Sequence, residues 1–271
     1  GLWRFGGKTN QPKLEIISTN PKSIRATVVD RQNRLWVGTV REGLWTLDNG
    51  NLSRLSNVEL PIGEARSLLA DSRGQLWIGG TKGLFSWDGS KLSTHSPSSD
   101  SGLFDVRAIC ENRDGAIWIG TQGRGLMRLR EGKFESIRAV GPSRMITVWS
   151  LYQDAEGCLW IGTGGLGLAR WRDGKLDFFN ATTGLPVETI YSILEDDSHN
   201  LWMGTHEGIF RVKKSECDAV VEKRLSKLQP TVFTRSDGMP TLQCASGFQP
   251  NACRTRDGRL WFATEIGRAH V

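Results

Sequence analysis

One position in this chain repeatedly carries a side chain that could bind a ligand. It lies eleven residues before each of five regularly spaced tryptophans, and it is occupied by Arg25, Arg66, Arg107, Trp149 and Tyr191. A guanidinium offers several N–H donors to an anion, and an aromatic ring offers a flat surface with a negative face. Together these groups suit a small anion or an oligosaccharide. A solvated loop position is the competing interpretation for each of them.

Further polar residues are expected on the same face of the molecule. They belong to hairpin tips between the second and third strands of each repeat described below. We expect Arg41, Glu42, Lys82 and Gln122 on this face, and we predict the ligand-binding residues to be Arg66, Arg107, Arg124, Trp149, Tyr191, His206 and Glu207.

Catalytic patterns are not evident in the sequence. The four histidines are scattered, no Ser/His/Asp or Cys/His order stands out, and acids recur singly at turns such as Asp71 and Asp154. One acid per turn is too few ligands for calcium, so we interpret these residues as Asx turns. We therefore predict no catalytic residue, no metal and no cofactor.

These side chains must be positioned by a repeated unit. A Leu-Trp or Ile-Trp dipeptide opens the phrase Trp-(Val/Ile/Met)-Gly-(Thr/Gly), and a Gly-Leu or Gly-Ile pair follows a few residues later. The tryptophans that open this phrase are Trp36, Trp77, Trp118, Trp160, Trp202 and Trp261. The first five of these six follow one another at intervals of 41 or 42 residues, and the last interval is 59 residues.

Each repeat contains four short segments of strand-forming residues separated by Gly, Asp and Asn turns, which predicts an antiparallel meander. A single sheet of this size is unstable alone, and radial stacking buries both of its faces. We predict an all-β fold, a β-propeller of four-stranded antiparallel blades, with about five full blades and a half blade at each end that could close as six. The indoles are expected to form the structural core, since burying one removes about 150–250 Å² from water.

The expected boundaries follow from the repeat. The third and fourth strands of a first blade occupy 1–22, because Gly1-Leu2-Trp3 matches the middle of a repeat. Full blades occupy 23–61, 62–101, 102–142, 143–185 and 186–240, and the first two strands of a last blade occupy 241–264. The fifth blade carries an insertion at 213–229, within which Ser215 to Leu228 has the apolar spacing of a short helix. Residues 265–271 resemble a translated sequencing-library adapter, and we exclude them from functional interpretation.

Composition excludes several classes of protein. The 271 residues include 24% charged and 38% apolar side chains, and no run approaches the roughly 18 apolar residues of a membrane span. The net charge of +6 comes from scattered Lys and Arg, which indicates a solvated surface rather than a nucleic-acid partner. Five cysteines form no CxxC pair, so we infer no metal site. Cys244 and Cys253 could form a disulfide or remain two thiols.

The recurring phrase D-x-x-G-x-LW-I-G-T-x-x-G-L-x-R resembles the two-component regulator propeller repeat. The likeness covers nearly all of residues 1–264, with departures such as His199 where glycine is usual and Gly80 in place of threonine. It implies the ligand-sensing region of a bacterial receptor on the periplasmic side of the inner membrane, non-catalytic itself. An immunoglobulin-like domain, a transmembrane helix and a histidine kinase or diguanylate cyclase output would follow.

The implied partners are an extracytoplasmic small molecule or oligosaccharide, the remaining domains of the same receptor, and a second copy if the receptor is a homodimer. Neither nucleic acid nor membrane contact is expected for this chain. Two alternatives stay open. One is a propeller lyase that resembles streptogramin B lyase, for which the adjacent His206 and Glu207 are the candidate residues; the other is a protein-interaction scaffold.

Overall fold

A computed structural model describes residues 2–6, 13–19, 21, 23–55, 63–97, 104–137 and 146–265. The chain divides into two compact units, residues 1–106 and residues 107–271, and each is described by itself. Of the expected C-terminal tail 265–271, only Glu265 lies within the described residues.

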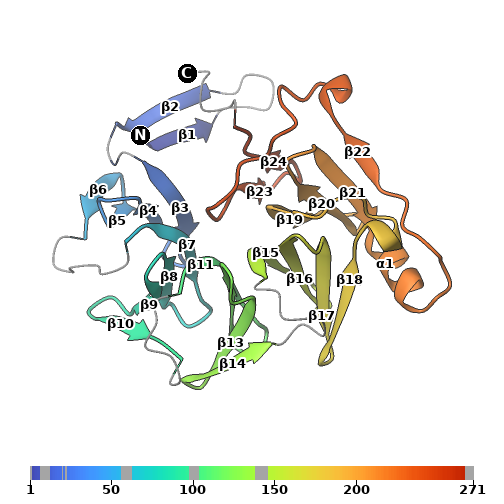
Figure 1. The fold of residues 1–271 in the computed structure, drawn as a ribbon. Coiled ribbons are helices and arrows are strands. Elements are labelled where there is room, and N and C mark those ends of the chain that lie inside the picture. The colour runs from blue at the N-terminus through green and yellow to red at the C-terminus, as the bar shows by residue number, and fades with distance from the viewer. Residues whose placement is uncertain are drawn as a thin grey trace. The chain divides into compact units, whose positions relative to one another are not determined.

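The N-terminal unit holds a two-stranded sheet followed by two four-stranded sheets (Figure 1). In each, strands adjacent in sequence pair antiparallel. The first sheet contains β1 (Leu2–Gly6) and β2 (Lys13–Ser18). The second contains β3 (Ile24–Val29), β4 (Leu35–Thr39), β5 (Leu44–Asp48) and β6 (Asn51–Arg54). The third contains β7 (Ala65–Ala70), β8 (Leu76–Gly80), β9 (Gly83–Trp87) and β10 (Leu92–His95).

The C-terminal unit continues the pattern with three four-stranded sheets and one two-stranded sheet. The first contains β11 (Val106–Glu111), which starts on the last residue of the preceding unit, β12 (Ile117–Thr121), β13 (Leu126–Arg130) and β14 (Lys133–Ile137). The second contains β15 (Thr147–Gln153), β16 (Leu159–Gly164), β17 (Leu168–Arg172) and β18 (Lys175–Phe179). The third contains β19 (Ser192–Glu195), β20 (Asn200–Gly204), β21 (Ile209–Lys213) and β22 (Thr231–Phe233), and the last contains β23 (Ala252–Arg254) and β24 (Leu260–Phe262).

These meanders confirm the predicted fold class. Within the described residues, five four-stranded antiparallel sheets are flanked in sequence by one two-stranded sheet on each side. The alternation of strands and tight turns also explains the high glycine content, because most turns place a residue in the left-handed region. His199 takes this conformation with φ 57°, where the corresponding Gly157 has φ 91°.

In each four-stranded sheet, the tryptophan on the second strand is buried or half-buried. Trp118 and Trp160 are among the largest buried side chains of the described residues. Trp202 is half-buried, and its ring stacks on that of Phe233 with centroids 5.1 Å apart. Trp261 differs from the prediction of a core residue, since its side chain is 43% exposed. Its sheet has only β23 and β24 among the described residues, so no third strand covers the indole there.

The turn acids do more than close their turns. Asp154 Oδ1 accepts the backbone N–H groups of Glu156 and Cys158 at 3.0 and 2.9 Å, as an Asx turn requires. Its Oδ2 accepts the indole N–H of Trp160 at 2.9 Å. The same indole bond joins Asp30 to Trp36, Asp71 to Trp77 and Asp196 to Trp202.

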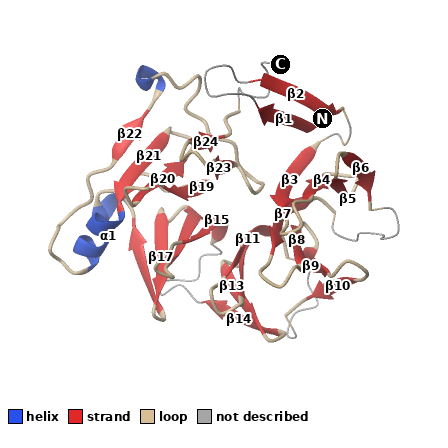
Figure 2. Cartoon of the chain, turned by 180° about the vertical axis from the view of Figure 1, so that it is seen from behind, coloured by secondary structure: helices blue, strands red, loops and turns tan. Residues whose placement is uncertain are grey.

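The helical insertion is shorter than the sequence predicts. The helix α1 (Lys214–Val221) lies beside β21 (Figure 2) and buries Cys217. It ends because Lys223 takes φ 61° and the N–H groups of Arg224 and Leu225 both turn back to the carbonyl of Ala219. A left-handed residue with such bonds terminates a helix, so the apolar spacing toward Leu228 belongs to turns.

All five cysteines are free thiols. Cys244 is buried and Cys253 is exposed, so of the two alternatives for this pair the structure has the unbridged one. Among the described residues, no helix combines the length and the apolar character needed to cross a bilayer.

Candidate ligand-binding site

The strand-start position occupies a β-bulge in three of the sheets. The register of β15 with β16 passes from Val148–Thr163 to Ser150–Gly162, which leaves Trp149 without a partner residue. The register of β7 with β8 skips Arg66, and that of β3 with β4 skips Arg25, in the same manner. A bulge bends the strand and redirects the side chain of the extra residue, and bulges are frequent beside active sites. In these three sheets the backbone therefore presents one residue away from the regular pleat.

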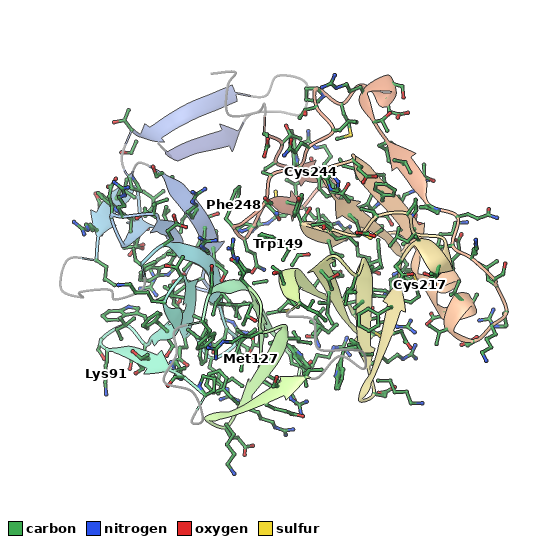
Figure 3. All side chains as sticks on the ribbon, viewed as in Figure 1. Lys91, Met127, Trp149, Cys217, Cys244 and Phe248 are labelled. Atoms are coloured by element: carbon green, nitrogen blue, oxygen red, sulfur yellow. The ribbon has the colours of Figure 1, made fainter. Side chains whose placement is uncertain are left out.

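Three of the predicted residues come together in the C-terminal unit. The guanidinium carbon of Arg107 lies 4.9 Å from the ring centroid of Trp149, within the range of a cation–π interaction. The Trp149 and Tyr191 rings meet edge to face, with centroids 5.7 Å apart and an interplanar angle of 87°. We call Arg107, Trp149 and Tyr191 the Arg–Trp–Tyr row. It crosses the starts of three successive inner strands, and Figure 3 labels Trp149 at its middle.

Residues at the ends of the second strands make room for this row. The guanidinium of Arg107 donates a hydrogen bond to Oε1 of Gln122, which follows β12. The last residue of β16 is Gly164, and a Cβ there would lie 2.7 Å from Nε1 of Trp149. Glycine at this position therefore allows the indole to lie over the strand. The row depends on these two partners as much as on its own side chains.

The row combines charge with partial burial. Arg107 is only 8% exposed, whereas Trp149 and Tyr191 are half-buried. Burial, with the nearby carboxylate of Glu265, raises the pKa of Tyr191 above its ordinary value, so its phenol stays neutral and can donate. A cation of reduced solvation over the ring of Trp149, with the phenol of Tyr191 next to that ring, can bind an anionic or hydroxyl-rich ligand.

Arg66 has a different setting in the N-terminal unit. Its Nη2 lies 3.0 Å from Oε2 of Glu64, and its Nε lies 3.7 Å from Oδ1 of Asp105. The side chains of Glu64 and Asp105 are partly shielded from solvent, so these two carboxylates offset the charge of Arg66. This residue was predicted as a ligand-binding residue, and its environment favours a structural ion pair instead.

The other predicted residues lie on hairpin tips. Arg124 is half-buried in the turn after β12. His206 and Glu207 are exposed on the turn between β20 and β21, with Nε2 and Oε1 3.2 Å apart. Among the described residues, no group of three or more His, Cys, Asp or Glu side chains is placed to hold a metal ion.

Another histidine pairs with a hydroxyl in the N-terminal unit. Nε2 of His95 lies 2.8 Å from Oγ of Ser86, and burial lowers the pKa of this histidine. Ser86 is fully buried and also accepts from the side chain of Gln75. A serine inaccessible to a substrate cannot be a nucleophile, so this pair belongs to the core.

Sequence reasoning missed a cluster of charges around α1. Nζ of Lys214 lies 3.0 Å from Asp154, 3.1 Å from Glu156 and 3.1 Å from Glu195. Glu195 also accepts from the phenol of Tyr152 at 3.0 Å. The cluster joins the β15–β18 sheet to the β19–β22 sheet. Asp154 and Glu156 lie about forty residues before Glu195 along the chain, so no local motif reveals the cluster.

A second feature that the sequence did not reveal is a loop at the end of the row. Residues 241–251 precede β23, and within them Gly247 and Gln249 reach β11. Their partners, Arg107 and Ile109, lie 140 residues earlier in the chain. Only the three-dimensional arrangement brings them together.

Comparisons with known proteins agree with the repeat. A family model described as the two component regulator propeller matches residues 19–41, 105–123, 142–165 and 184–207. Four segments of the chain thus match the two-component regulator propeller repeat, and each contains one of the regularly spaced tryptophans. No curated protein matches the sequence.

Solved structures share the fold of these two-component regulator propeller repeats. The extracellular domain of a hybrid two-component system of B. thetaiotaomicron matches with a TM-score of 0.75 and 23% identity, over 95% of this chain and 34% of that one. The extracellular domain of a one-component system of the same organism matches at 0.60 and 18%, over 97% and 43%. Virginiamycin B lyase from Staphylococcus aureus matches at 0.66 and 13%, over 92% and 87%. The chain thus spans about a third of the first of these proteins and less than half of the second.

Proposed function

We propose that this chain is the ligand-sensing propeller region of a bacterial membrane-bound receptor, located outside the cytoplasm, with a histidine kinase or a diguanylate cyclase as output. The repeats match those of two-component regulators, and the fold is that of extracellular domains in two-component systems. The proposal assigns binding and no reaction to this chain.

The observation that carries the proposal is the Arg–Trp–Tyr row. Core positions of the repeat keep nearly the same residue from blade to blade, whereas the strand-start position changes from arginine to tryptophan to tyrosine. The change produces a continuous surface of one guanidinium and two rings, held by Gln122 and Gly164. Packing of the sheet does not by itself require a large aromatic residue at position 149, because glycine is needed at position 164 to leave space for the indole.

The row favours a small anion or an acidic or neutral oligosaccharide. Arg107 supplies a charge and N–H donors, the indole supplies a face for the apolar side of a sugar ring, and the Tyr191 hydroxyl supplies a donor and an acceptor. A ligand would signal only through different affinities for two arrangements of the receptor. Arg107 and Trp149 lie on β11 and β15, and Tyr191 immediately precedes β19. These strands belong to three different sheets, so a bound ligand would favour one spacing of the sheets.

The experiment is a binding screen on the full chain by isothermal titration calorimetry. Inorganic anions and neutral and acidic oligosaccharides are titrated into the wild type and into Arg107→Ala and Trp149→Ala. We expect at least one ligand whose affinity falls ~10-fold or more in both variants, as for hot-spot residues. Arg130→Ala is the matched control, because Arg130 is exposed on β13 and pairs with Asp114 at 3.6 Å.

Two results would count against the proposal. Absence of binding across both ligand classes would remove it, and so would a ligand whose affinity is unchanged in both row variants. Circular dichroism and thermal melts of each variant show whether a loss of binding reflects a loss of fold.

A further inference from the structure

The loop before β23 has an anchored base. The N–H groups of Cys244 and Ala245 donate to the carbonyls of Thr205 and Ala263 at 2.9 and 2.8 Å. At the other end of the loop, the buried side chain of Asn251 donates to the carbonyls of Tyr191 and Ala245, both at 2.9 Å. These bonds draw the two ends of the loop together and fix them beside the Tyr191 end of the row.

The tip of this loop, Ser246–Gln249, reaches the opposite end of the row. The N–H of Ile109 donates to Oε1 of Gln249 at 2.9 Å, and Nε2 of Gln249 donates to the carbonyl of Ile109 at 3.3 Å. β11 is the edge strand of its sheet, and the N–H and C=O of one residue point to the same side of a strand. The carboxamide therefore occupies the open edge of β11 as the backbone of a further strand would.

The same tip contacts the arginine of the row. Gly247 has φ 84°, and a Cβ at this residue would lie 3.4 Å from Nη1 of Arg107. Phe248, labelled in Figure 3, belongs to the same tip. The segment therefore lies against the guanidinium that the proposed ligand would contact.

The base and the tip are held in different ways. The base is fixed by backbone bonds and a buried asparagine, whereas Gln249 holds the tip through one half-buried side chain. Segments with few bonds open locally at much lower free energy than the sheets around them. Opening of the tip requires the loss of the two Gln249 bonds and leaves the base in place.

We propose that Ser246–Gln249 is a latch over the Arg107 end of the row, closed by Gln249 and opened when a ligand engages the guanidinium. This inference rests on the proposed binding function and assigns its regulation. A site that is accessible only in the open state has its apparent affinity reduced by the fraction of open molecules. Weakening the latch should therefore increase ligand affinity.

The latch is tested first without a ligand, by amide hydrogen exchange of the full chain. In Gln249→Met, which keeps side-chain length and removes both bonds, we expect Ile109 to exchange ~10-fold to 100-fold faster. Amides of β12 and β13 should be unchanged. Gln243→Met is the matched control, because Gln243 is an exposed glutamine of the same loop.

A second variant protects the test against a failure to fold. Gly247→Ala strains the left-handed backbone of the tip and leaves the Gln249 side chain intact, and it should accelerate Ile109 exchange in the same local manner. Unchanged Ile109 exchange in both variants would overturn the latch. Exchange that rises uniformly over β11–β14 in both would also overturn it, because the loop would then be part of the fold.

The regulatory step is tested with sulfate as the probe anion. Sulfate is titrated into chain labelled with 5-fluorotryptophan, and the ¹⁹F resonance of Trp149 is assigned with Trp149→Phe. We expect Gln249→Met to bind at a concentration ~10-fold lower than the wild type. Equal binding by both proteins would refute the latch and leave the binding function standing. Faster exchange without any sulfate binding would leave the latch standing and count against an anionic ligand.

Discussion

The indole of Trp118 provides a quantitative test of the repeat's internal design. In this blade Asn112 replaces the usual aspartate, and its side chain donates to Oδ1 of Asp114 at 2.5 Å and accepts from Gln153. Nε1 of Trp118 is buried and has no hydrogen-bond partner, unlike the indoles that bond to aspartate in four other repeats. A buried donor without an acceptor costs about 1–3 kcal/mol.

The perturbation is the double variant Asn112→Asp, Asp114→Ser, which gives this turn the pattern of Asp196 and Ser198. A carboxylate at 112 can still accept from Gln153 and also from the indole, and serine at 114 avoids a pair of like charges. We expect the free energy of unfolding to rise by about 1–2 kcal/mol. At about 2–4 °C per kcal/mol, this corresponds to a Tm about 2–8 °C higher.

The assay is urea unfolding followed by tryptophan fluorescence, with Trp118→Phe completing a double-mutant cycle. Phenylalanine has no indole N–H, so the double variant should gain nothing in that background. An equal gain with phenylalanine would refute the reasoning, since the benefit would then come from the turn alone.

The expected gain also depends on pH. Burial by itself raises the pKa values of Asp30, Asp154 and Asp196, but the bonds from the indoles and backbone outweigh it and hold them below 3.8. A depressed carboxyl pKa stabilises the folded state above the unfolded value of about 3.9 and loses that contribution as pH falls through the folded value. The advantage of aspartate at 112 should thus be complete near neutral pH and disappear below about pH 4.

Three further outcomes follow from the structure. Lys214→Met should destabilise the chain by about 3–5 kcal/mol in urea unfolding, because it leaves buried carboxylates without their cation, whereas Lys223→Met on the exposed turn should change it by less than about 0.5 kcal/mol. Gly164→Ala should displace the indole of Trp149, shift its ¹⁹F resonance and lower the Tm, and adding Trp149→Phe should restore part of the lost Tm. A Tm of Gly164→Ala equal to that of the wild type would contradict the 2.7 Å approach of a Cβ at 164 to Nε1 of Trp149. Cys253 should be the first thiol that a maleimide labels in the native chain, while the buried thiols react only after unfolding. The labelled cysteines are identified by mass spectrometry, and a buried thiol that reacts as fast as Cys253 would contradict this prediction.

The fold could be predicted from the sequence because each repeat is a local unit. An interval of 41 or 42 residues between tryptophans allows four strands and their turns, and each indole requires a neighbouring sheet for burial. Trp261 was mispredicted for the same reason, since the described part of its sheet has two strands. The helix after β21 was predicted in place but too long, because apolar spacing alone does not show the left-handed turn at Lys223.

The site was only partly predictable. The strand-start position was found because its residue types recur, but the bulge that redirects them has no sequence signature, since arginine and tryptophan both occupy it. The contact of Gln249 with Ile109 spans 140 residues and uses backbone groups that every residue has. Nothing in the sequence of either segment could therefore indicate the other.

The repeat separates the residues that build a blade from those that give it a function. The aspartate–indole bond recurs in four repeats, and the strand glycines recur with the tryptophans, because these residues build the blade. The strand-start residue and a residue near the end of the second strand form a pair in two blades: Arg107 has Gln122 as its hydrogen-bond acceptor, and Trp149 has Gly164, which leaves space for its ring. These two positions differ between the two blades, while the core residues of the repeat stay nearly the same. Under the proposed function, a binding surface built from such positions on successive blades could change its ligand preference while the interval between tryptophans stays constant.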